Sequence, residues 1–167
     1  FLGPNLFNPP VPRGWITLTP TFTLSGEYND NVHEQNDNRK SDFIFGFTPG
    51  VTLSMQRPEY RLLAGYNVTS QVFAKETDLS GFANKQQLFA DGFYLLSPST
   101  RLTLTERFFY DEDTSAVSPD NVSSGRSKSL RNVAVLGVQH QLTQLTTLRA
   151  AFTQVHVHFS GDDESHR

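Results

Sequence analysis

Residues 15–28 read WITLTPTFTLSGEY, and two classes of side chain alternate through this stretch almost without interruption. The apolar set is Ile16, Leu18, Pro20, Phe22, Leu24 and Tyr28, and the polar set is Thr17, Thr19, Thr21, Thr23, Ser25 and Glu27. Side chains of a strand point alternately to opposite faces. The stretch therefore predicts a β-strand with one apolar face and one polar face.

The length of this strand indicates its surroundings. At roughly 3.3 Å per residue and a tilt of about 40°, it would span roughly 35 Å of height. Strands of water-soluble proteins average about 5–6 residues. Length and alternation together favour a strand that crosses a bilayer, with the apolar face in lipid and the threonines in a polar lumen.

The alternation recurs along the chain, which predicts further strands over residues 42–56, 60–75, 86–96, 100–113, 130–142 and 147–159. Long polar loops (29–41, 76–85, 114–128) alternate with short turns (57–59, 97–99, 143–146). In outer-membrane barrels the short turns are periplasmic and the long loops external. The sequence thus predicts an all-β fold, an antiparallel up-and-down transmembrane β-barrel or part of one, with about seven to eight long strands. We also expect bends or bulges at Pro20 and Pro49, which cannot donate a ladder hydrogen bond.

Composition agrees with a barrel. The 167 residues are 37% hydrophobic and the mean hydropathy is -0.41, which suits a membrane barrel because only alternate strand residues need be apolar. Fourteen phenylalanines and five tyrosines could supply interfacial girdles. The chain has no apolar run of about 18 residues, so the sequence predicts no membrane-spanning helix. With no cysteine there is no disulfide, and the net charge of -3 argues against a nucleic-acid partner.

Residues 1–14, FLGPNLFNPPVPRG, contain four prolines and have no period, so they predict an extended periplasmic arm. A floppy terminus is the alternative. The start of the chain does not resemble a signal peptide, so we expect a processed form or a fragment. Residues 15–167 are predicted to form the barrel, which we expect to be incomplete because bacterial single-chain barrels have even strand numbers.

The polar side chains of the alternating strand pattern are predicted to line the lumen. They are Thr17, Thr19, Thr21, Thr23, Arg61, Asn67, Asp91, Arg101, Arg107 and Arg149. These side chains could select solutes by charge. They could equally form a structural ladder of ion pairs, and the two roles are compatible.

The apolar parity of the last three predicted strands contains polar residues, notably Glu106, His140 and Gln154. An unpaired carboxylate near mid-membrane is costly. We therefore hypothesise that these residues face another protein chain or subunit. The alternative is a local bulge near Thr105 or Thr153 that inverts the parity.

Two groups could carry chemistry. His156 and His158 share a face near Asp162, Asp163, Glu164 and His166, which makes them weak candidates for metal binding or for activating water. Residues 111–113 and Asp120 could bind calcium, but they lack the glycine turn and the regular ligand spacing of a calcium loop. A solvated rim explains both groups, so we expect no metal, no cofactor and no enzymatic activity.

The strings EYNDNV (27–32), KSD (40–42) and TPGV (48–51) resemble those of outer-membrane β-barrel porins, among them barrels associated with exopolysaccharide secretion and exosortase systems. The resemblance implies a bacterial outer-membrane porin-like barrel, in contact with lipid and lipopolysaccharide, that passes polar solutes or assists polysaccharide export. A structural barrel that anchors a multi-protein assembly is the alternative. A soluble lipocalin-like barrel, with its apolar parity turned inward, is the rival fold.

Overall fold

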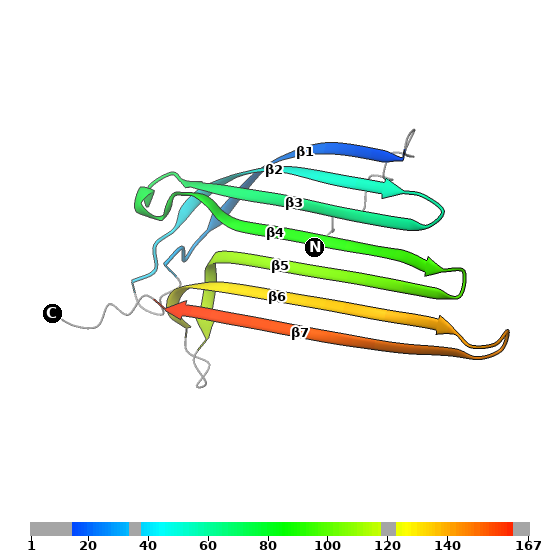
Figure 1. Cartoon of the computed structure of the whole chain (residues 1–167). Helices are drawn as coiled ribbons and strands as arrows, with labels where there is room; N and C mark the ends of the chain where they lie inside the picture. Colours follow the sequence, from blue (N-terminus) through cyan, green and yellow to red (C-terminus); the bar gives the residue numbers. More distant parts are fainter. Residues whose placement is uncertain (1–14, 34–37, 118–122, 162–167) are drawn as a thin grey trace.

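The chain folds into one antiparallel sheet. The computed structural model describes residues 15–33, 38–117 and 123–161, and within these ranges it contains seven strands and one short 3-10 helix (Figure 1). Their bounds are β1 Ile16–Asn29, β2 Asp42–Gln56, β3 Tyr60–Phe73, η1 Thr77–Leu79, β4 Gly81–Ser97, β5 Thr100–Val117, β6 Ser123–Gln141 and β7 Thr147–Gly161.

The sheet order is β1 to β7, so each strand pairs with its neighbour in the sequence. This confirms the predicted all-β, up-and-down antiparallel arrangement. The sheet is not closed, and β1 and β7 are its edges. Closure into a barrel therefore stays a prediction. The predicted arm, residues 1–14, lies outside the described residues.

The strand bounds agree with the sequence at β1, β2 and the short turns, and differ at two hairpins. β4 begins at Gly81 rather than at residue 86. β5 continues to Val117 rather than ending at residue 113, and β6 begins at Ser123 rather than at residue 130. The predicted loop over 114–128 is thus wrong in extent. Backbone pairing does not require apolar side chains, so this hairpin continues through a polar segment that showed no strand pattern.

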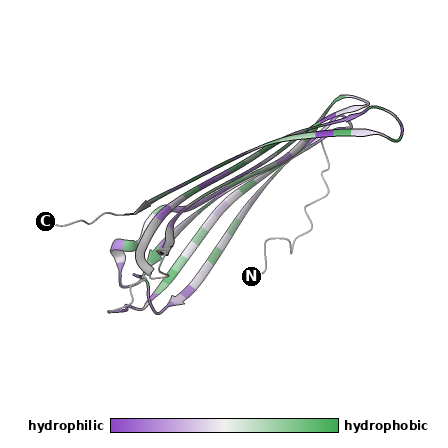
Figure 2. Cartoon of the chain, turned by 90° about the horizontal axis from the view of Figure 1, so that it is seen from below, coloured by the Kyte–Doolittle hydropathy of each residue, from purple (hydrophilic) through white to green (hydrophobic). Residues whose placement is uncertain are grey.

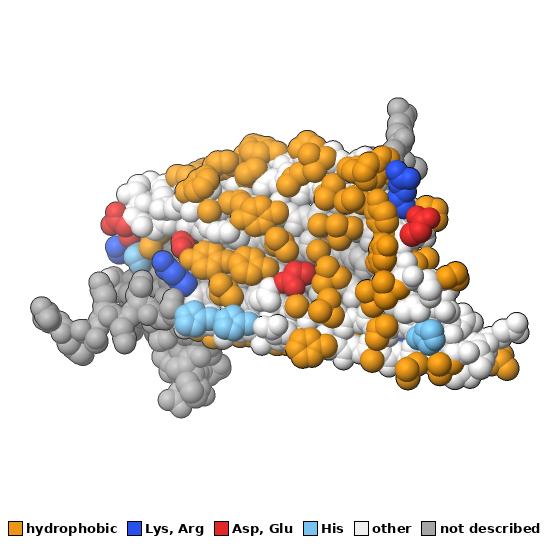
Figure 3. Space-filling model, in the orientation of Figure 1, with side chains coloured by type: hydrophobic (Ala, Val, Ile, Leu, Met, Phe, Trp, Pro, Cys, Tyr) orange, Lys and Arg blue, Asp and Glu red, His pale blue; other side chains and the backbone are white. Residues whose placement is uncertain are grey.

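The alternation of side chains gives the sheet two faces. We call the face that carries Leu18, Phe22 and Phe45 the apolar face, and the face that carries Thr19, Thr21 and Asp91 the polar face. Figure 2 shows a single curved layer of strands, and Figure 3 shows apolar side chains gathered over one side of it. Leu24 is 73% exposed and Phe22 63% exposed. The apolar parity does not converge on a sealed interior, unlike in the lipocalin-like rival.

The two prolines do not shift the register. β1 pairs with β2 continuously from Ile16 to Asn29, so the bulge expected at Pro20 is absent. At Pro49 the ladder between β2 and β3 is interrupted, but pairing resumes in the same register beyond it. Side chains bridge this gap, since the hydroxyls of Thr48 and Thr69 lie 2.8 Å apart.

A bulge lies instead at the loop end of β3 and β4. The register shifts between Thr69 and Gln71, and Ala83 adopts a φ of 60°. Side chains accept the freed backbone donors: Asn84 Oδ1 accepts from the Gln71 N–H (3.0 Å), and Ser70 Oγ accepts from the Ala83 N–H (3.1 Å). The irregular backbone is therefore largely hydrogen-bonded.

The only buried apolar side chains among the described residues are Val32, Ile44 and Phe73, with Leu79 packed against them. Ile44 pairs with Phe73 in the register of β2 and β3. This cluster lies where the β1–β2 and β3–β4 connections meet, at what we call the loop end of the sheet. The opposite end, with connections 57–59, 98–99 and 142–146, we call the turn end.

Close packing on the polar face depends on Gly65 in β3. A Cβ at this position would clash with Cε1 of Phe89 and would lie 2.5 Å from its Cζ. Phe89 is the partner of Gly65 on β4, so its ring covers the glycine. Glycine is required at this position by the close approach of the ring.

We predict that Gly65→Ala lowers the free energy of unfolding by about 1–3 kcal/mol, because the Phe89 ring must leave its place. Urea unfolding measures this change. Gly26→Ala is the matched control, since a Cβ there meets nothing within 4 Å, and it should change stability by less than about 1 kcal/mol. If Gly65→Ala lowers the free energy of unfolding as much in a Phe89→Ala background as in the parent chain, the proposed contact is contradicted.

Candidate functional site

The predicted lumen residues all lie on the polar face. Thr17, Thr19, Thr21 and Thr23 pair with Ser54, Thr52, Gly50 and Thr48 of β2. The Asn67 amide lies against Gly50, where a Cβ would clash with it. Arg61, Asp91, Arg101, Arg107 and Arg149 lie on the polar face of β3, β4, β5 and β7. The structure thus brings these side chains to one surface, while their role as lumen lining stays a prediction.

An ion pair lies at the middle of the polar face. Nη2 of Arg107 donates to Oδ2 of Asp91 at 2.7 Å, and Nη1 donates to the carbonyl of Glu106 at 2.7 Å. Thr105 Oγ1 donates to the other oxygen of Asp91 at 3.3 Å. Both charged side chains are more than a third exposed, so the pair contributes at most about 1 kcal/mol to stability. Its main effect is to hold the arginine in position over the sheet.

Two phenylalanines on this face contact arginines, a feature not predicted from the sequence. Cζ of Arg101 lies 3.7 Å from the ring centroid of Phe93, and Cζ of Arg107 lies 5.9 Å from that of Phe89. Such cation–π contacts orient a guanidinium without neutralising it. A signal was present in the chain, because Phe89 and Phe93 share the parity of Asp91.

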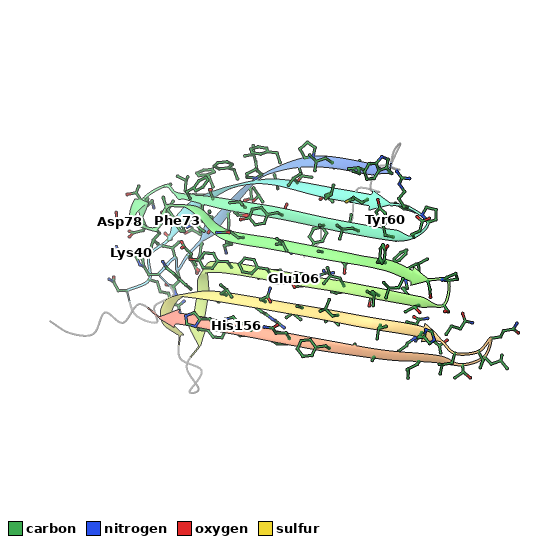
Figure 4. The ribbon with its side chains drawn as sticks, in the orientation of Figure 1. Lys40, Tyr60, Phe73, Asp78, Glu106 and His156 are labelled. Carbon is green, nitrogen blue, oxygen red and sulfur yellow. The ribbon has the colours of Figure 1, made fainter. Side chains whose placement is uncertain are left out.

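A second polar cluster ties the loop end together (Figure 4). Oε2 of Glu76 lies 2.8 Å from Nε2 of His33 and accepts a hydrogen bond from Nζ of Lys40 at 3.1 Å. Asp42, which is fully buried, accepts from the backbone N–H groups of Phe43, Lys75 and Glu76. These contacts join segments far apart in the chain, so no local pattern announces them.

Glu106 lies on the apolar face, near its middle (Figure 4). The register of β5 with β4 and β6 is continuous around it, and the register of β7 is continuous around Thr153. The alternative of a bulge that inverts the parity at either place is therefore wrong. The amide of Asn132 donates a hydrogen bond to Oε1 of Glu106.

The polar residues of the apolar face are adjacent across three strands. Glu106 and Gln154 both pair with Ala134, and His156 pairs with Asn132. On the opposite face of β7 the exposed side chains are Val155, Val157 and Phe159. The polarity of the two faces is thus inverted along this half of β7. The sequence predicted polar residues on the apolar face here, but not the apolar residues on the polar face. That these residues face a partner chain stays a hypothesis.

The histidines differ in their contacts. At the turn end, Nδ1 of His140 lies 2.9 Å from the Thr100 hydroxyl. His156 and His158 share the apolar face, as predicted. No group of three or more histidine or acidic side chains within the described ranges is placed to bind a metal ion. The other members of the predicted histidine group, within 162–166, lie outside those ranges.

The acidic segment at the loop end of β5 forms ion pairs. Asp111 lies 3.4 Å from Lys85, and Glu112 lies 3.6 Å from Lys128 and accepts from the Tyr110 hydroxyl at 2.7 Å. Asp120 lies outside the described residues. These pairs use two of the four carboxylates that the calcium hypothesis named, Asp111 and Glu112.

Comparisons with models of protein families, with curated proteins and with solved structures found no match to this chain. In the part of the chain that the structure describes, no helix has the length and hydropathy needed to cross a membrane.

The Glu76 cluster should respond to acid. The hydrogen bond with His33, followed by that from Lys40, lowers the pKa of Glu76 below its ordinary value of 4.5, although burial opposes this. Because the folded pKa is lowered, the stabilisation is present above pH 4.5 and is lost as the pH falls through the folded pKa. We predict that backbone amides 74–80 lose protection from hydrogen exchange in this window.

Two variants test this prediction. Glu76→Gln should reduce the acid transition and leave only the part due to Asp42, which accepts from the Lys75 and Glu76 N–H groups. Asp78→Asn, which changes an exposed acid on η1, should leave the whole transition unchanged. Identical acid profiles for the parent chain and Glu76→Gln would contradict the assigned role of Glu76.

Proposed function

We propose that this sheet is part of an outer-membrane, porin-like β-barrel that passes polar solutes or assists export of a polysaccharide. One observation carries the proposal: a single layer of long strands exposes an apolar face over β1–β4 and a polar face behind it. Water disfavours such an extended exposed apolar surface. A bilayer outside and water inside would suit both faces.

The open edges support the same proposal. β1 and β7 each have one side without a neighbouring strand in the described sheet. In lipid, unpaired backbone groups cost several kcal/mol each, so spanning strands require a closed barrel. We propose that further strands pair with β1 and β7 to close it.

The polar face offers the chemistry of a solute path. Hydroxyls of β1 and β2 face the same side as the guanidinium groups of β3, β5 and β7. Hydroxyls and fixed charges hydrate polar solutes and bias passage by charge. The proposed mechanism is passive, since nothing in the arrangement requires a chemical step.

A scaffold that anchors a protein assembly is the second candidate, and the polar residues around Glu106 favour it. A carboxylate, two carboxamides and a histidine on the apolar face would be costly against hydrocarbon. Against a protein partner they could be hydrogen-bonded. A barrel that contacts lipid through β1–β4 and a partner through β5–β7 would satisfy both surfaces.

Conductance separates the two candidates. We predict that the barrel completed by the further strands next to β1 and β7, purified and reconstituted in a planar bilayer, gives discrete conductance steps, because an aqueous lumen carries ions. A protein that inserts into the bilayer without conducting would refute the porin-like proposal and favour the scaffold.

The orientation of the faces is testable by paired substitutions at the middle of β1. We predict that Phe22→Arg impairs assembly in liposomes by about 2–4 kcal/mol, the cost of a cation at the bilayer midplane. Thr23→Arg, one residue along and on the polar face, should assemble normally. Folding yield, measured by gel mobility and protease protection, reports the difference. The reverse ranking would refute the proposed lipid contact.

A further inference from the structure

Cations on the polar face have different partners at its two ends. Towards the loop end and at the middle, Lys85 pairs with Asp111 and Arg107 pairs with Asp91. Arg131, exposed near the middle, is a single exception that forms no ion pair among the described residues. At the turn end lie Arg61, Arg101 and Arg149. Among the described residues, no carboxylate forms an ion pair with any of these three. The turn end of the polar face therefore carries uncompensated positive charge.

The register places the three arginines at the same end of the sheet, on β3, β5 and β7. Arg61 pairs with Phe93, and Gln139 pairs with both Arg101 and Arg149. Since neighbouring strands lie about 4.8 Å apart, the Cα atoms of Arg101 and Arg149 are roughly 10 Å apart. Arg61 lies four strands from Arg149, roughly 19 Å by the same spacing, so the three side chains suit several anionic groups of one extended solute rather than a single small ion. Gln139 lies between Arg101 and Arg149, and its amide offers a further donor.

An aromatic ring positions Arg101. Its guanidinium carbon lies 3.7 Å from the Phe93 centroid, and its Nε is buried without a hydrogen-bond partner. Stacking on a ring fixes the plane of a guanidinium while leaving its charge uncompensated. A positioned but unneutralised guanidinium is suited to bidentate recognition of a carboxylate, sulfate or phosphate.

We propose that Arg61, Arg101 and Arg149 form an anion-binding site at the turn end of the polar face, which takes the oxyacid groups of a solute. The inference rests on the proposed function where it makes this site the anion-selective mouth of the pore. Binding itself requires only the folded sheet. The site would concentrate anionic solutes before they reach the neutralised Asp91–Arg107 region.

The test titrates the detergent-solubilised full chain by isothermal calorimetry with oligogalacturonate and with a neutral malto-oligosaccharide of equal length. The anionic ligand should bind more tightly, and its affinity should fall as salt increases. The triple variant Arg61→Gln/Arg101→Gln/Arg149→Gln should weaken this binding about ten-fold or more. Arg149→Gln alone, on the edge strand, should weaken it several-fold and guards against misfolding of the triple variant.

Arg131→Gln is the matched control, since Arg131 is exposed on the same face but nearer the loop end. This variant should bind oligogalacturonate with the affinity of the parent chain. Arg101→Lys keeps the charge but loses the planar donor pair, so it should give an intermediate affinity. Equal affinity for both ligands, or equal loss in Arg131→Gln and Arg149→Gln, would overturn the proposal. Vesicles of anionic lipid should not compete with oligogalacturonate for the protein. If the vesicles bind through these arginines and free oligogalacturonate does not, the arginines contact lipid phosphates and the proposal is overturned.

Reversal potentials across a salt gradient separate this inference from the proposed function. A conducting protein that prefers anions, and loses that preference in the triple variant, supports both. Conduction without anion preference refutes the selective mouth alone. Anion binding without conduction refutes the porin-like function and leaves the binding site supported.

Discussion

The structure depends on a register that runs through the middle of seven strands without a slip of one residue. Since side chains alternate with a period of two, one such slip would move an entire strand's apolar set to the other face. The irregularities that occur lie towards the ends, such as those at Thr69–Gln71 and Leu95–Ser97. The central segments therefore keep one apolar and one polar surface over β1–β4.

Because the register is continuous, the polar residues on the apolar face are not the result of a shifted strand. Glu106 cannot be explained by inverted parity, because pairing on both sides of it is regular. Its carboxylate is instead hydrogen-bonded by Asn132 on the apolar face. Together with His156 and the exposed valines of β7, it indicates that β5–β7 require a different environment from β1–β4. The proposed arrangement, with a partner over this side and lipid over the other, would accommodate both.

The cations of the polar face have different partners along the length of the sheet. Acidic partners hold Lys85 and Arg107, while aromatic stacking holds Arg101 and leaves its charge available. Exposed pairs such as Asp91–Arg107 add little stability, so their placement matters more for the local field. The two ends of the same surface would attract solutes differently.

The sequence by itself determined the strands of regular alternation, the short turns and the membership of each face, because period-two patterns and turn residues act locally. It also placed Thr19, Asp91 and Arg107 on one surface. Only the tertiary structure decided the Asp42 and Glu76 contacts, the covering of Gly65 by Phe89 and the link between Glu106 and Asn132, because these join residues distant in sequence. The extension of β5 and β6 through polar residues was likewise decided by backbone pairing between strands, which leaves no periodic signal in the side chains.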